Sequence, residues 1–153
     1  DRLKTHPLAR AVRVGKFTIA AVEATIRRHI EGRTDGLPAL AALALTADDV
    51  RVRCRAIVRR VRRLPGGTAV DLRVVPTGSE AGGGSLPGRT FPSYAIDVSV
   101  PGRSPNDVEA ALRGGEPPVL GRITEGRLLL DCRTLLPGED AIVAATLAAL
   151  GTR

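Results

Sequence analysis

AVDLRVV at residues 69–75 and YAIDVSV at residues 94–100 decide the fold, because apolar and polar residues alternate in both stretches. A period of two is typical of a strand with one buried face. Further along the chain, residues 119–124 and 127–131 predict a hairpin that turns at Gly126. We therefore expect a small sheet that is mainly antiparallel.

Six other segments have apolar residues at helical spacing or clear helix start signals, such as Thr46 before two aspartates and Ser104 before a proline. The expected helices cover a short turn from Pro7 and residues 17–31, 38–45, 47–64, 105–113 and 139–150. Helices that precede two pairs of strands favour an α+β domain, with a small, mainly antiparallel sheet covered by helices. We expect residues 1–45 to form a helical linking segment and residues 46–153 to form this domain.

The amino-acid composition is typical of a globular protein, except that arginine supplies nearly all of the positive charge. The 23 Lys and Arg residues against 16 Asp and Glu give a net charge of +7, and only Lys4 and Lys16 are lysines. Arginine suits contact with phosphate or RNA, although the joint enrichment in Ala, Arg, Gly, Val and Leu also indicates genome-wide compositional bias. No apolar run is long enough for a membrane span, so we expect no membrane contact and a cytoplasmic location.

Residues 6–16 (HPLARAVRVGK) contain a candidate anion site. On a helix, Arg10 and Arg13 would share a face, because they are three residues apart. Two guanidinium groups on one face can clamp a phosphate-like dianion through charge-assisted hydrogen bonds. From spacing alone, a solvated helix face is the favoured interpretation of the pair.

A glycine-rich stretch, Gly82-Gly83-Gly84-Ser85, lies between the first two predicted strands. Glycine allows a close backbone approach, so this segment could press against a ligand or another domain. It is neither a dinucleotide fingerprint nor a P-loop, because it does not lead from a strand into a helix. A flexible hairpin connection is the alternative interpretation.

The remaining candidates favour structural roles. Cys54 lies on the apolar side of its helix and is predicted to be a core residue, and Cys54 and Cys132 indicate neither a disulfide framework nor a metal site. Asp131 and Arg133 alternate with apolar residues, as an exposed strand face would. The arginine series from Arg51 to Arg63 either tracks RNA phosphates or forms a solvated face. The residues alone therefore predict a basic α+β domain without a catalytic residue of its own.

Three segments in series carry a resemblance to a known family: HPLARAVRVGK, GGGSLPGRTFPS and PPVLGRITEGRLLLDCRTLLPGED. Their order and spacing resemble the C-terminal part of bacterial selenocysteine synthases. The resemblance implies the small domain of a fold type I, pyridoxal phosphate-dependent enzyme. It also implies conversion of L-seryl-tRNA(Sec) to L-selenocysteinyl-tRNA(Sec), with selenophosphate as the selenium donor.

The resemblance assigns roles to a few positions of this sequence. Arg10 and Arg13 match positions that resemble a binding site for the phosphate of selenophosphate. The segment with Gly82, Gly83, Gly84, Ser85 and Arg89 resembles a loop that faces the catalytic groove. In the family, the lysine that binds pyridoxal phosphate precedes the HPL segment, and neither lysine of this sequence matches it. We therefore expect the cofactor to be held outside this chain, and the isolated chain to be inactive.

The partners that the resemblance implies are seryl-tRNA(Sec), selenophosphate and further copies of the same protein in a ring-like homo-oligomer such as a decamer. Three alternatives stay open. The first is a pyridoxal phosphate-dependent lyase that acts on a phosphorylated amino sugar acid. The second is a basic module that binds RNA through the arginines from Arg51 to Arg63. The third is a purely structural domain.

Overall fold

The computed structural model describes residues 5–33, 36–82, 86 and 88–152. The chain divides into two compact units, one up to Ala41 and the other from Ala42 onwards. This division falls inside helix α4 (Pro38–Ala44), a few residues before the boundary predicted from the sequence.

Among its described residues, the first unit contains helices α2 (Pro7–Ala11) and α3 (Lys16–Ile30), close to the predicted positions, and the start of α4. The Nδ1 atom of His6 caps α2, because it accepts a hydrogen bond from the backbone N–H of Leu8 at 3.2 Å. Among the described residues of this unit, none is buried. The apolar side chains of α3 are exposed, and they include Phe17, Ile19, Val22, Ile26 and Ile30.

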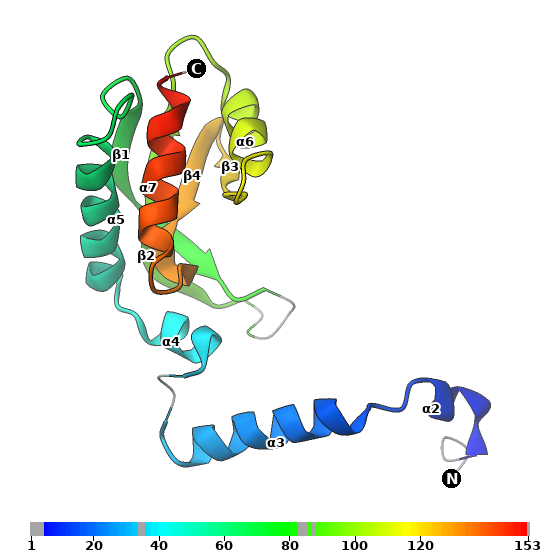
Figure 1. Cartoon of the computed structure of the whole chain (residues 1–153). Helices are drawn as coiled ribbons and strands as arrows, with labels where there is room; N and C mark the ends of the chain where they lie inside the picture. Colours follow the sequence, from blue (N-terminus) through cyan, green and yellow to red (C-terminus); the bar gives the residue numbers. More distant parts are fainter. Residues whose placement is uncertain (1–4, 34–35, 83–85, 87, 153) are drawn as a thin grey trace. The chain divides into compact units, whose positions relative to one another are not determined.

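The second unit is built on a four-stranded sheet in the order β1-β2-β4-β3 (Figure 1). The strands are β1 (Asp71–Glu80), β2 (Thr90–Ser99), β3 (Arg122–Thr124) and β4 (Arg127–Asp131), and each neighbouring pair is antiparallel. The antiparallel sheet and the hairpin at Gly126 are therefore confirmed.

Three helices cover one face of the sheet: α5 (Ala47–Val61), α6 (Pro105–Arg113) and α7 (Glu139–Leu150). Figure 1 shows α5 and α7 side by side over the strands, with α6 beside β3 and β4. Burial of each large apolar side chain in this core contributes about 1.5–3 kcal/mol. The α+β fold class is confirmed. The buried side chains include Leu72, Ile96, Val98, Leu128 and Leu130 from the sheet, and Val50, Ile57, Val61, Leu112 and Leu147 from the helices.

Two of these helices begin with complete capping boxes. Thr46 precedes α5, and its hydroxyl accepts a hydrogen bond from the N–H of Asp49 at 3.2 Å while the Asp49 carboxylate accepts from the N–H of Thr46 at 2.9 Å. Ser104 and Asp107 form the same arrangement at α6. These reciprocal bonds satisfy N–H groups that a helix start leaves unpaired, which explains why both starts fall where the sequence predicts them.

The capping boxes predict a dependence of stability on pH. The hydrogen bond from the Thr46 hydroxyl holds the pKa of Asp49 below its ordinary value, and the Ser104 hydroxyl does the same for the pKa of Asp107. A lowered pKa in the folded state stabilises the protein above the unfolded-state pKa, and this stabilisation is lost as the pH falls through the folded-state pKa. We expect an Asp49→Asn/Asp107→Asn variant to lose less thermal stability than the wild type between pH 5 and pH 3. An equal fall in the unfolding temperatures of both proteins over this pH range would contradict the stabilising role of these two carboxylates.

Candidate functional site

Arg10 and Arg13 lie at the end of α2 rather than on one helix face. The helix ends at Ala11 and its C-cap is Val12, so Arg13 lies beyond it. The helical pairing predicted from the sequence is therefore wrong. The two residues still share one turn, because the N–H of Arg13 donates to the carbonyl of Arg10 at 3.3 Å, and both are exposed. Two exposed guanidinium groups can bind an oxyanion, but they cannot act as a general base, because arginine keeps its proton in proteins.

The glycine-rich stretch lies in the connection from the end of β1 at Glu80 to the start of β2 at Thr90. Gly82 is described, whereas the predicted residues Gly83, Gly84 and Ser85 lie outside the described residues. Arg89 is exposed beside the start of β2. This connection is therefore the tip of a long hairpin, and its position depends on how the two strands are held.

An aspartate at the end of β4 holds both strands of that hairpin. One carboxylate oxygen of Asp131 accepts a hydrogen bond from the hydroxyl of Ser79 on β1, and the other accepts from the hydroxyl of Ser93 on β2 at 3.2 Å. The same oxygen accepts from the N–H of Arg133 at 3.0 Å and so caps a 3₁₀ helix, η1 (Cys132–Thr134). Ser93 is only 2% exposed, so this carboxylate fixes the hairpin from within the protein.

Arg133 is buried, which contradicts the exposed strand face predicted for it. Its side chain is 5% exposed. Nη1 donates to the carbonyls of Ala42 at 2.9 Å and Leu45 at 2.8 Å, and Nη2 donates to the carbonyl of Pro92 at 2.7 Å. The guanidinium group therefore joins the end of α4 to strand β2, next to the residues that Asp131 holds.

A second arginine holds the hairpin from the opposite edge of the sheet. Arg122 lies on β3, at one edge, and its Nη2 donates to the hydroxyl of Thr77 and, at 2.9 Å, to the carbonyl of Gly78 on β1, at the other edge. Strand β1 is thus held near its end by Arg122 as well as by Asp131. Neither anchoring contact was predicted from the sequence, because both join residues more than forty positions apart.

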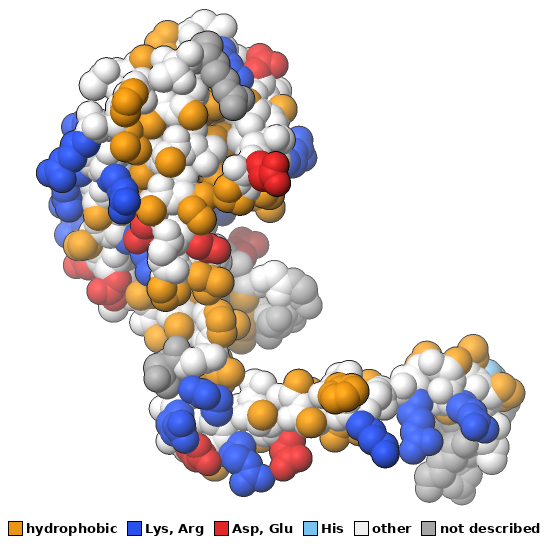
Figure 2. Space-filling model, in the orientation of Figure 1, with side chains coloured by type: hydrophobic (Ala, Val, Ile, Leu, Met, Phe, Trp, Pro, Cys, Tyr) orange, Lys and Arg blue, Asp and Glu red, His pale blue; other side chains and the backbone are white. Residues whose placement is uncertain are grey.

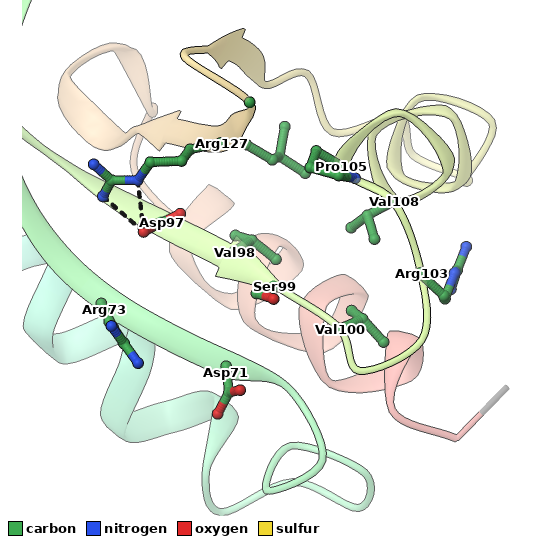
Figure 3. Close-up of a pocket in the computed structure, with 12 residues that line it drawn as sticks. Asp71, Arg73, Asp97, Val98, Ser99, Val100, Arg103, Pro105, Val108 and Arg127 are labelled. Atoms are coloured by element: carbon green, nitrogen blue, oxygen red, sulfur yellow. Dashed lines mark hydrogen bonds and ion pairs between the residues drawn. The ribbon is translucent and has the colours of Figure 1, made fainter.

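A cavity of about 280 Å³ lies at the other end of the sheet, between the end of β2, the start of β4 and the first turn of α6 (Figure 3). Two of the arginines that line it have hydrogen-bond partners. Two nitrogens of Arg127 donate hydrogen bonds to the same carboxylate oxygen of Asp97, Nη2 at 2.7 Å and Nε at 3.1 Å. Arg103 donates to the carbonyl of Asp107 at 3.3 Å. We assign this cavity to the packing of the sheet edge.

The two cysteines meet in the core. Cys54 on α5 and Cys132 in η1 are at most 1% exposed, which confirms the core position predicted for Cys54. Contact with the Cys54 thiol and burial both raise the pKa of Cys132. A buried, protonated thiol is a poor nucleophile, so Cys132 packs rather than reacts.

Within the described ranges, no cluster of three or more His, Cys, Asp or Glu side chains could hold a metal ion. A search of the same residues finds no helix that is long and apolar enough to cross a membrane. The lysine among these residues is Lys16, which is exposed at the start of α3. The described side chains therefore do not fit a pyridoxal phosphate site.

The fold is shared with part of a solved enzyme. The structure of a D-glucosaminate-6-phosphate ammonia-lyase matches with a TM-score of 0.55 and 22% sequence identity, over 95% of this chain and 35% of that one. This likeness shows that the chain shares its fold with part of that structure.

The sequence comparisons give the family. The sequence model described as L-seryl-tRNA selenium transferase matches residues 1–136, and the chain belongs to this family. The L-seryl-tRNA(Sec) selenium transferase of Geobacter sulfurreducens is 41% identical over 99% of this chain and 33% of its own length. Those of Moorella thermoacetica and Hyphomonas neptunium are 41% and 40% identical, over 30% and 29% of their lengths. The chain thus spans about a third of these relatives, and the family resemblance of the three sequence segments is confirmed.

Proposed function

We propose that the chain is the C-terminal portion of an L-seryl-tRNA(Sec) selenium transferase, which converts L-seryl-tRNA(Sec) to L-selenocysteinyl-tRNA(Sec) with selenophosphate as donor. The observation that carries this proposal is 41% identity to such an enzyme over 99% of the chain. We call the longer protein the full-length transferase. We further propose that it works in the cytoplasm as a ring-like homo-oligomer.

In this proposal the chain supplies binding and positioning. Arg10 and Arg13 bind the phosphate group of selenophosphate through charge-assisted hydrogen bonds. Asp131 and Arg122 hold the hairpin whose tip, with Gly82 and Arg89, faces the catalytic groove. Pyridoxal phosphate belongs to the full-length transferase and is held outside this chain.

The test is product formation by the full-length transferase. The protein is incubated with seryl-tRNA(Sec), with and without selenophosphate, and the aminoacyl-tRNA is analysed after hydrolysis. We expect selenocysteinyl-tRNA(Sec) only when selenophosphate is present. A protein that binds pyridoxal phosphate but leaves seryl-tRNA(Sec) unchanged would contradict the proposal.

One alternative function has an observation in its favour. The fold is similar to that of the D-glucosaminate-6-phosphate ammonia-lyase, so a lyase that acts on a phosphorylated amino sugar acid would also use an arginine pair for a phosphate group. The identity to this lyase is 22%, against 41% to the selenium transferases. Release of ammonia from such a sugar acid, in an assay where seryl-tRNA(Sec) is not converted, would favour the lyase.

A further inference from the structure

We propose that the outward face of α5 is a contact surface for the phosphate backbone of the RNA substrate. The surface, which we call the arginine ridge, consists of Arg55, Arg59, Arg60, Arg62 and Arg63. The identity of the RNA as seryl-tRNA(Sec) rests on the proposed function. The ridge itself follows from the packing, the pairing and the charge of this helix.

The helix has two opposite faces. The buried face consists of Val50, Cys54, Ile57, Val58 and Val61 and packs into the core. All five arginines of the ridge are exposed, on α5 and in the turn that follows it. Figure 2 shows basic side chains gathered along the outer side of this helix. The ridge is therefore presented to solvent by a helix whose orientation the core fixes.

The two arginines nearest the start of α5 have other roles. Arg51 pairs with Asp48 at 2.9 Å and lies over the ring of Tyr94, 5.6 Å from its centre. Arg53 donates to the carbonyls of Cys132 at 3.1 Å and Leu135 at 3.0 Å. By contrast, the contacts of the described residues include no side-chain hydrogen bond or ion pair for any arginine of the ridge.

This lack of pairing contrasts with three other exposed arginines, each of which pairs with a nearby glutamate. Arg27 pairs with Glu23 at 3.0 Å, Arg33 with Glu31 at 3.3 Å and Arg113 with Glu109 at 2.9 Å. In the ridge, arginines instead face one another at spacings of three and four residues. The sequence has no acidic residue between Asp49 and Asp71 to compensate them.

Like charges at these spacings repel one another and destabilise a helix. The favourable position of cations near a helix C-terminus offsets part of this repulsion. A bound polyanion would neutralise these arginines and so remove the remaining repulsion among them. The uncompensated repulsion is thus a second feature, besides exposure, that points to a negatively charged partner.

The geometry favours a nucleic acid backbone over a single anion. Arg55, Arg59 and Arg62 form a row on one side of the helix that extends for about 10 Å, at 1.5 Å per residue. A guanidinium fork matches phosphate oxygens in a bidentate way. No aromatic side chain belongs to the ridge, so it has no platform for stacking bases. The ridge therefore adds affinity for RNA without reading its sequence.

The test compares two triple variants of the full-length transferase that lose the same charge. The first, Arg55→Gln/Arg59→Gln/Arg62→Gln, removes the row of the ridge. The control, Arg27→Gln/Arg33→Gln/Arg113→Gln, removes three exposed arginines that are already paired. Binding of tRNA(Sec) is measured by fluorescence anisotropy at several salt concentrations.

We expect the ridge variant to bind tRNA(Sec) at least about tenfold more weakly at 0.1 M salt. The slope of log affinity against log salt should fall by about two to three, because each lost phosphate contact contributes roughly 0.7–0.9. The control should stay within about twofold of the wild type, and a triple Arg→Lys variant of the row should keep most of the slope. Unfolding temperatures of all variants verify that each is folded.

Three results would overturn the proposal: wild-type affinity in the ridge variant, an equal loss in the control, or ridge-dependent binding to anionic lipid vesicles that tRNA does not compete for. Turnover separates this proposal from the proposed function. A ridge contact should raise the KM for seryl-tRNA(Sec) and leave kcat unchanged. If the wild type binds tRNA through the ridge but makes no selenocysteinyl-tRNA(Sec), the proposed function is wrong, whereas the assignment of the ridge as an RNA contact is retained.

Discussion

Replacement of both Arg10 and Arg13 by alanine in the full-length transferase is expected to abolish most selenium transfer. Hydrogen bonds to charged groups contribute about 1.5–3 kcal/mol each, so loss of two such contacts should reduce kcat/KM for selenophosphate on the order of 10²–10⁴-fold. The binding of seryl-tRNA(Sec) should be unchanged. The measurement is the initial rate of selenocysteinyl-tRNA(Sec) formation at several selenophosphate concentrations.

The double substitution should affect anion binding without lowering the stability of the protein. Arg10 and Arg13 are exposed, and their unit has no buried residue among those described, so the double substitution should not lower the unfolding temperature. A matched control is Arg27→Ala/Arg33→Ala, which removes the same charge from the same unit. If both double variants lose activity equally, or if Arg10→Ala/Arg13→Ala keeps the wild-type kcat/KM, then the assignment of the anion site is wrong.

The second large effect concerns stability. An Arg133→Leu substitution leaves the carbonyls of Ala42, Leu45 and Pro92 without this donor, although Pro92 is exposed and the other two residues are half-buried. Hydrogen bonds to a charged group contribute about 1.5–3 kcal/mol each, and water can replace part of this interaction at half-buried carbonyls, so we expect a total loss of about 3–5 kcal/mol in the free energy of unfolding. At roughly 2–4 °C per kcal/mol, the unfolding temperature should fall by about 10 °C.

Urea and thermal unfolding of the chain would measure this loss. The control is Arg113→Leu, because Arg113 is exposed and makes only a surface pair with Glu109, which is worth at most a few tenths of a kcal/mol. An Arg133→Leu variant that is as stable as Arg113→Leu would contradict the structural role of the guanidinium group. An Arg133→Lys variant should lie between the two, since a single ammonium group cannot reach all three carbonyls as a planar fork does.

The helices and the pairing of the strands could be predicted from the sequence, because both depend on local periodicity and start signals. The lengths of β1 and β2 could not. Residues 69–75 were predicted as the first strand, yet β1 continues to Glu80 through Pro76 and Gly78. A proline is tolerated there because β1 is an edge strand, and the position of a strand within a sheet depends on distant residues.

The candidate site was predictable only in part. The turn that contains Arg10 and Arg13 follows from the sequence, but the end of its helix at Ala11 does not. Asp131 and Arg133 continue the alternation of β4, which predicts exposure. The chain instead enters a 3₁₀ helix at Cys132 and turns Arg133 inward. Its three carbonyl partners lie more than forty residues away, so no local pattern could identify them.

The exposed apolar side of α3 has a consequence for how the sequence can change. A helix of fifteen residues is marginal in water when nothing packs against it, and the described residues of its unit bury no side chain. The apolar side chains of Ile19, Val22 and Ile26 therefore contribute little burial to their own unit. Polar substitutions at these positions should cost that unit little stability, so its helix depends on local propensity more than on packing.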